Sequence, residues 1–152
     1  IDNGAGYAEA LSELEKAAPG VEVAAVLAEN AETGVSSLRN LRADFPDAAR
    51  DALAATVADQ ATDGSVTGRL AAFVRAQTGA RSLSPREGDD PDAILSRAEA
   101  ALAASDISGA LSEVQALPPD AAAAMQDWTA RAQTRQDVLA ALADLSAQKS
   151  SN

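Results

Sequence analysis

Proline and glycine divide this chain into short segments, and this division constrains its fold more than any other feature. Pro19, Pro46 and the pair Pro118-Pro119 interrupt stretches in which alanine, leucine and valine recur at helical spacing. Alanine is the strongest helix former, and few β-branched residues compete with it. The pattern predicts helices within residues 7–18, 21–34, 35–45, 46–64, 65–79, 90–103, 107–117 and 120–148.

Local signals place the ends of several of these helices. Gly34 is expected to cap one C-terminus, and Ser36 or Ser37 the next N-terminus. Pro46 is expected to close that helix and open another. Asp90 is predicted as an N-cap with Pro91 in the first helical position, and residues 105–106 as a tight turn. Short amphipathic helices must pair to bury their apolar stripes, so we predict an all-α fold of short antiparallel helical hairpins followed by a long C-terminal helix.

The composition argues against an enzyme. The chain contains no histidine and no cysteine, which removes the commonest general base, thiolate chemistry and the commonest transition-metal ligand. The carboxylates of Glu87, Asp89, Asp90 and Asp92 lack the order of a calcium loop, so they are interpreted as helix-capping groups. We therefore predict no catalytic residue, no metal site and no cofactor. A net charge of −11, without aromatic residues between the arginines, also argues against nucleic acid.

Residues 64–86, here called the basic window, hold four arginines and no acidic residue. The rest of the chain has 8 basic and 23 acidic residues, a net charge of −15. Within the window, apolar side chains share one face of the predicted helix at 65–78, as in helices that lie on membrane surfaces. The lipid-binding candidates are Arg69, Leu70, Phe73, Val74, Arg75, Arg81, Leu83 and Arg86. The alternative is that Leu70 and Phe73 pack in the core and the arginines pair with nearby acids.

The last predicted helix carries a second candidate surface. Its apolar residues recur at spacings of three and four, and a long helix shows more surface than one hairpin covers. The candidate partner or dimer contacts are Met125, Trp128, Arg131, Arg135, Leu139 and Leu142. The alternative for Trp128, the single tryptophan, is that it closes the hairpin core.

Residues 69–140 resemble the C-terminal signature domain of the mitofilin family. The shared features are an arginine-containing segment, a glycine-acid turn at Gly88, the stretch "ILSRAEAAL", the aspartate-led "DISGAL" and a "DW" pair that opens a long helix. The residues that carry the likeness are Gly88, Ile94, Leu95, Arg97, Ala98, Glu99, Leu102, Asp106, Ala110, Leu117, Asp127, Trp128, Ala132 and Arg135. Two positions depart: Ser105 stands where the family tends to have glycine, and Gln133 where it tends to have a basic residue.

The resemblance implies a membrane-shaping scaffold rather than an enzyme. It implies an upstream transmembrane anchor outside this chain and a position at the periplasmic face of a bacterial inner membrane, equivalent to the mitochondrial intermembrane space. It also implies self-association, binding to anionic phospholipid and contact with outer-membrane β-barrel assembly machinery. Residues 27–54 look like the segment that precedes the signature domain in alphaproteobacterial members, and arginine in preference to lysine suits a bacterial source.

The resemblance also suggests a division of the chain, because the family's lipid-binding segment lies directly before its signature domain. This gives an N-terminal helical segment, a lipid-binding segment, the signature domain and a disordered tail, at residues 1–64, 65–86, 87–148 and 149–152. The competing hypothesis is a soluble α-helical interaction module without lipid contact.

Overall fold

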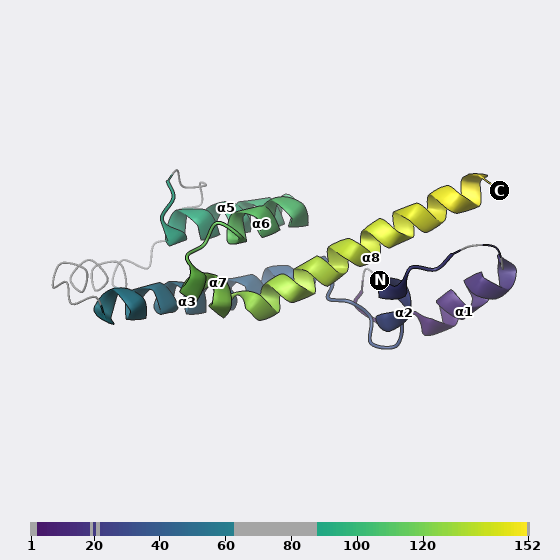
Figure 1. Cartoon of the computed structure of the whole chain (residues 1–152), viewed down its shortest axis with the longest axis horizontal. Coiled ribbons are helices and arrows are strands. Elements are labelled where there is room, and N and C mark those ends of the chain that lie inside the picture. Colours follow the sequence, from purple (N-terminus) through teal and green to yellow (C-terminus); the bar gives the residue numbers. More distant parts are fainter. Residues whose placement is uncertain (1–2, 19, 21, 63–87, 152) are drawn as a thin grey trace. The chain divides into compact units, whose positions relative to one another are not determined.

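A computed structural model of the chain describes residues 3–18, 20, 22–62 and 88–151, apart from the side chains of residues 57–62 and 149–151. No strand occurs in these ranges, and the expected all-α fold with a long C-terminal helix is confirmed (Figure 1). The helices are α1 (Ala8–Ala17), α2 (Ala25–Glu29), α3 (Leu38–Thr62), α5 (Pro91–Ala103), α6 (Ile107–Val114), α7 (Pro119–Ala124) and α8 (Gln126–Ser151).

The helices form two compact units, each with its own core. Unit 1 combines residues 1–41 with residues 130–152, and unit 2 consists of residues 42–129. The boundaries expected at 64/65 and 86/87 border residues outside the described ranges and stay predictions. The tail expected after residue 148 differs from the structure, because α8 continues to Ser151.

The core of unit 1 joins segments from the two ends of the chain. Leu27, Val35, Val138, Ala141 and Leu145 are buried together. Partly buried apolar side chains pack around them, namely Tyr7, Leu14, Val23, Val26 and Leu142. This core therefore depends on contacts between residues more than 100 positions apart in the sequence.

A glycine allows the N-terminal segment to lie close against the loop that precedes α3. Gly34 has a φ of +73°, and a Cβ atom there would come within 2.5 Å of the carbonyl oxygens of Gly4 and Ala5. The backbone N–H of Tyr7 donates to the carbonyl oxygen of Ala31 at 2.6 Å. Only glycine suits position 34, because it tolerates this φ and leaves room for the neighbouring backbone.

Two helices of the N-terminal half differ from the sequence prediction. The expected helix at 21–34 is reduced to α2, where the side-chain amide of Asn30 donates to the carbonyl oxygen of Val26 at 2.8 Å. Such local side-chain bonds compete with helix propagation. The expected break at Pro46 is wrong, since α3 runs through it. Ser37, in contrast, caps α3 as expected, because its hydroxyl accepts from the backbone N–H of Asn40 at 3.1 Å.

Burial explains how α3 accommodates a proline. A proline inside a helix removes one backbone hydrogen bond and costs about 3 kcal/mol. The neighbouring Phe45 and Ala49 are buried in the core of unit 2. Fully burying one large apolar side chain contributes about 1.5–3 kcal/mol. Packing of this face of α3 therefore offsets much of the cost of Pro46.

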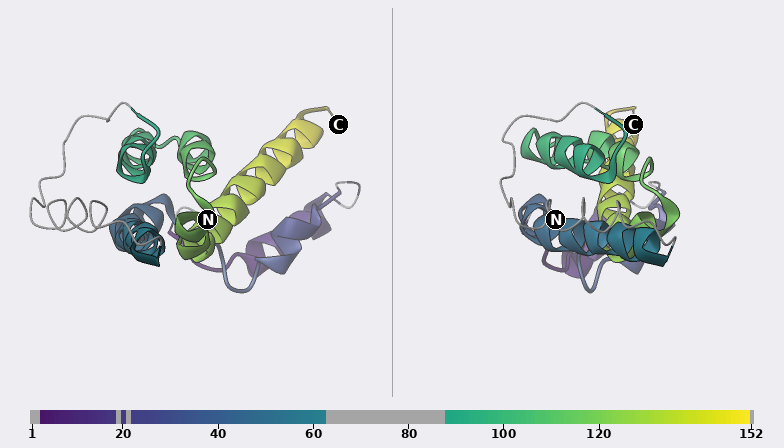
Figure 2. Two further views of the ribbon diagram at one scale, coloured as in Figure 1. Left: turned by 60° about the vertical axis from the view of Figure 1, so that its left-hand side comes forward. Right: turned by 90° about the vertical axis from the view of Figure 1, so that its left-hand side faces the viewer.

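The core of unit 2 gathers residues of α3, the α5–α6 hairpin, α7 and the start of α8. Helices α5 and α6 pack against each other as a helical hairpin (Figure 2). The rings of Phe45 and Trp128 meet edge to face, with centroids 5.1 Å apart and planes at 76°. The single helix predicted at 120–148 is interrupted at Met125, which is fully buried between α7 and α8.

Candidate functional site

The predicted lipid-binding side chains all lie outside the described ranges. Arg69, Leu70, Phe73, Val74, Arg75, Arg81, Leu83 and Arg86 fall between residues 62 and 88, so their role stays a prediction. The structure does describe Gly88, the second residue after the basic window. The junction between the window and the first helix of the α5–α6 hairpin can therefore be built residue by residue.

At this junction the chain turns sharply into α5. Gly88 has a φ of +126°, a region that favours glycine. The side chain of Asp90 accepts from the backbone N–H of Ala93 at 3.2 Å, and Pro91 occupies the first helical position. The N-cap and the proline predicted from sequence are thus confirmed, and they fix where α5 begins.

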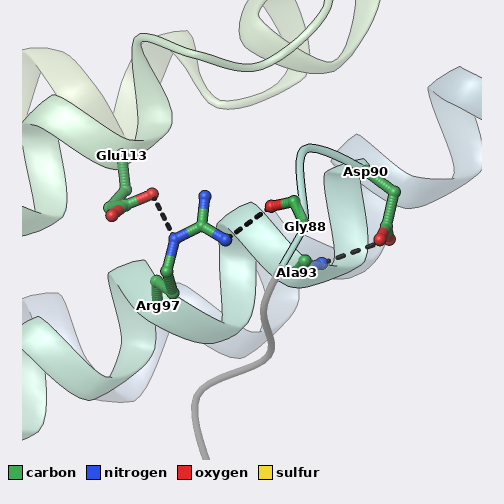
Figure 3. Close-up of polar contacts among 5 residues, drawn as sticks. All are labelled: Gly88, Asp90, Ala93, Arg97 and Glu113. Carbon is green, nitrogen blue, oxygen red and sulfur yellow. Dashed lines mark hydrogen bonds and ion pairs between the residues drawn. The ribbon is translucent and has the colours of Figure 1, made fainter.

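Arg97 connects three parts of this region (Figure 3). Its Nε donates to Oε2 of Glu113 on α6 at 2.8 Å, and its Nη1 donates to the carbonyl oxygen of Gly88 at 2.7 Å. The Arg97 and Glu113 side chains are 28% and 30% exposed, so solvent screens this ion pair only in part. The planar guanidinium offers several donors in fixed directions, which allows one side chain to hold both groups.

The other end of α5 closes with a Schellman motif. The N–H of Asp106 donates to the carbonyl oxygen of Ala101 at 2.8 Å, and that of Ser105 to the carbonyl oxygen of Leu102 at 2.9 Å. Ser105 has a φ of +67° and is the only non-glycine residue with positive φ in the described ranges. Glycine is usual at this position of the motif. This explains why the family that the sequence resembles tends to have glycine where this chain has Ser105.

Asp106 then starts α6. Its carboxylate accepts from the backbone N–H of Gly109 at 2.8 Å. A Cβ atom at Gly109 would lie 2.3 Å from the same carboxylate. The tight turn predicted at 105–106 is therefore confirmed, and glycine at position 109 leaves room for the capping carboxylate.

Arg42 of α3 holds this turn from outside the hairpin. Its Nε donates to the carbonyl oxygen of Leu102 at 2.7 Å, and its Nη2 reaches the carbonyl of Ala103 and the hydroxyl of Ser105 at 3.0 and 2.9 Å. These groups include carbonyls at the C-terminus of α5, where a cation also complements the helix dipole. Sequence reasoning missed Arg42, because its partners are 60 to 63 positions away and no local motif indicates them.

Two of the predicted contacts on the last helix prove to be core residues. Met125 is fully buried and Trp128 is 1% exposed, both inside unit 2. The expectation that they contact a partner is revised, since their side chains are engaged within this chain. The alternative interpretation of Trp128 as part of the hairpin core describes its position.

The other four candidates lie on the part of α8 that belongs to unit 1. Arg135 is 5% exposed, and its Nη1 donates to the carbonyl oxygen of Ser36 at 3.3 Å. Leu142 is partly buried against the core, and Arg131 is half-buried. Leu139 is 39% exposed. Among the described residues, it is the one large apolar side chain that is exposed. Of the six candidates, Leu139 therefore offers the most apolar surface to a partner.

Three further observations limit what the described region can do. No helix within residues 3–62 and 88–151 is long and apolar enough to cross a membrane. In the same part of the chain, no three metal-ligating side chains gather where they could hold an ion. The Tyr7 hydroxyl is buried and has no hydrogen-bond partner among the described residues, and desolvation raises the pKa of this group.

The described structure thus defines an all-helical protein in which Arg97 contacts the turn before α5 and Arg42 contacts the end of α5. A model of the mitofilin family, described as a mitochondrial inner membrane protein, matches residues 10–149, and the chain belongs to this family. Comparisons with curated proteins and with solved structures returned no match.

Proposed function

We propose that this chain is part of a non-enzymatic scaffold that binds an anionic membrane surface through the basic window and self-associates. In this role it helps organise invaginations of an inner membrane, from its periplasmic or intermembrane-space face. Membership of the mitofilin family over residues 10–149 supports a membrane role. The observation that carries the proposal is the basic window itself, with four arginines and no acid in a chain of net charge −11.

The magnitudes are sufficient for reversible binding. Each arginine near an anionic surface contributes about 1 kcal/mol, and each buried Leu or Phe side chain about 1.5–3 kcal/mol. The acidic remainder of the chain is repelled by the same surface. Screening acts beyond about 8 Å at physiological salt, so the window can bind while distant acids remain in solution. Binding should therefore weaken steeply as salt is added.

The test is co-sedimentation with vesicles of equal parts phosphatidylglycerol and phosphatidylcholine. The variant Phe73→Asp/Arg81→Glu inserts charge into the apolar face and reverses one basic contact. We expect its binding to fall by about tenfold or more, because the two changes remove over 1.4 kcal/mol of interaction. Binding by the unaltered chain should fall between low and high salt, and should be weak on phosphatidylcholine alone.

A matched control separates the position of these changes from their charge. Ala43→Asp/Arg50→Glu makes the same change in net charge at two exposed positions of α3. Arg50 forms an exposed local pair with Asp47, so the control should fold normally. If both double variants lose binding equally, the basic window is not the binding segment. Full binding by Phe73→Asp/Arg81→Glu would overturn the proposal directly.

Self-association is the second part of the proposal, and α8 supports it. Leu139 is exposed on a long helix whose neighbouring exposed positions include Ala140 and Ala143. Small residues beside a large apolar one allow two helices to approach closely. A second copy of the chain would cover this surface through the same face of its own α8.

A further inference from the structure

Unit 1 contains a groove between α8 and the chain just before α2. Its volume is about 360 Å³, within the range of about 300–1,000 Å³ that is usual for ligand sites. Three carboxylates and small apolar side chains line it, among them Glu22, Asp137, Asp144, Ala140 and Ala141. We propose that this groove is the docking site for a helix of a partner protein that carries two basic residues seven positions apart. The proposal goes beyond membrane binding and does not rest on it.

Hydrogen bonds within unit 1 give the groove a defined form. The backbone N–H of Glu22 donates to Oε1 of Gln148 at 3.3 Å, which joins the segment before α2 to α8. On α8, Oδ1 of Asp137 accepts from the side-chain amide of Gln133 at 2.9 Å. This bond restrains the Asp137 carboxylate and leaves its second oxygen able to accept from another donor. The two sides of the groove are therefore held together without a partner.

The groove lining suits a cationic side chain better than a metal ion. Among the described side chains, none forms an ion pair with Glu22 or Asp144, and both carboxylates are exposed. In the same ranges, no three metal-ligating groups gather closely enough to hold an ion. Lysine and arginine can instead lay their aliphatic stems along an apolar surface such as Ala140, while the charged end reaches a carboxylate. The net charge of −11 also attracts a basic partner from a distance.

The length of the groove and the spacing of its carboxylates identify a helix as the occupant. Asp137 and Gln148 are eleven residues apart on α8, so the groove follows this helix for about 16 Å. Asp137 and Asp144 are seven residues apart, which places them on one face of α8, about 10 Å from each other along its axis. A helix that lies along α8 presents residues seven positions apart at the same spacing. Two basic residues there can reach both carboxylates at once.

The sequence argues against a second copy of this chain as the occupant. None of the twelve basic residues lies seven positions from another basic residue. The nearest spacings are six, within residues 64–86, and eight, between Arg42 and Arg50. In a helix, either spacing turns the second side chain by about 80° or more away from the first. The groove therefore fits a different protein.

Two synthetic peptides test the spacing by fluorescence anisotropy with the full chain in solution. Each has about 20 residues of alanine and glutamine, long enough to populate a helix, and carries two arginines and a fluorescein label. The arginines are seven positions apart in the first peptide and five apart in the second, so only the first presents both on one face. At low salt the first should bind about threefold more tightly, because it alone forms both exposed ion pairs. Equal affinities would overturn the predicted spacing.

Variants of the chain test the site with the first peptide. Glu22→Gln/Asp144→Asn neutralises two carboxylates of the groove with little change of shape, and should weaken binding about fivefold. The matched control Glu15→Gln/Asp51→Asn makes the same change in net charge at two exposed positions outside the groove lining, and should alter the affinity less than about twofold. Equal weakening in both variants would mean general attraction to an acidic chain and would overturn the groove as the site. Unchanged binding by Glu22→Gln/Asp144→Asn would overturn it directly.

Light scattering decides whether a second copy competes for the groove. If the chain alone associates at low salt and Glu22→Gln/Asp144→Asn abolishes this association, a second copy occupies the groove, and the proposal of a different partner is overturned. Association that these substitutions leave unchanged supports a groove that is free for another protein. All of these measurements are made without vesicles, so a failure of the proposed membrane binding leaves their outcome unaffected.

Discussion

Ser105 shows how one residue can be strained and supported at once. Its φ of +67° belongs to the left-handed region, which costs an ordinary L-residue about 1–2 kcal/mol. Its hydroxyl accepts from Nη2 of Arg42 at 2.9 Å, and its N–H closes the end of α5. At Ser105 a strained backbone is therefore accompanied by a hydrogen bond between its hydroxyl and α3.

This balance leads to a prediction for substitutions at position 105. Ser105→Ala keeps the strained backbone and loses the hydroxyl, so it should lower the free energy of unfolding by about 0.5–1 kcal/mol. Ser105→Gly loses the same hydroxyl but relieves the strain, and should be about 1 kcal/mol more stable than Ser105→Ala. Urea unfolding followed by Trp128 fluorescence gives both values.

The variant Arg42→Ala supplies the control for this comparison. In that background the serine hydroxyl has lost its partner on α3, so Ser105→Gly should stabilise the chain outright. A glycine variant less stable than the alanine variant would show that the backbone at Ser105 is not strained. Equal effects of Ser105→Gly with and without Arg42 would show that the hydroxyl contact contributes nothing.

At the scale of elements, α8 combines two kinds of surface. Val138, Ala141 and Leu145 face the core of unit 1, whereas Leu139 is 39% exposed on the same helix. Leu139→Asp places a charge on the exposed face without disturbing that core. If this face joins two copies, the apparent molar mass at high protein concentration should fall toward that of a monomer in the variant.

Light scattering across a dilution series measures this effect. Ala116→Asp, at an exposed position outside α8, provides the control and should leave the molar mass unchanged. A monomer at all concentrations for the unaltered chain would contradict self-association of this segment. An associating chain that is insensitive to Leu139→Asp would place the contact elsewhere.

The same scale shows how far the sequence could predict the elements. That the elements are helices was predictable, because the alanine content and the spacing of apolar residues both indicate a helix over almost every described segment. The caps at Ser37 and Asp90 were predictable too, because each depends on a side chain within three residues of its partner. These features are local, and local chemistry can be read from a sequence.

The errors concerned features that tertiary packing decides. Pro46 was expected to end a helix, but burial of Phe45 and Ala49 carries α3 through it. The break at Met125 has no glycine or proline to signal it, and it coincides with a fully buried side chain. The roles of Arg42 and Arg97 likewise depend on partners that only the folded chain brings near. The candidate membrane-binding residues remain a sequence prediction supported by charge and family.

At the scale of the whole molecule, the ends of the chain share one core. Leu27 from the N-terminal part is fully buried in unit 1 together with Val138 and Leu145 of α8. Unit 2 has a separate core around Phe45 and Trp128. The sequence suggested a division into consecutive segments, whereas the described helices group by contacts that no local pattern reveals. A substitution in one core should therefore first destabilise the unit to which that core belongs.

Leu27→Ala tests this organisation. Removing a fully buried leucine costs about 2–5 kcal/mol, because apolar contacts are lost and a cavity remains. Hydrogen exchange read by mass spectrometry should show faster exchange in residues 25–35 and in residues 138–145, more than 100 positions away in sequence. Amides of α5 and α6 should keep their protection. The matched control Leu102→Ala removes a buried leucine of unit 2 and should reverse the pattern. Loss of protection throughout the chain in both variants would mean that the two units unfold as one cooperative structure.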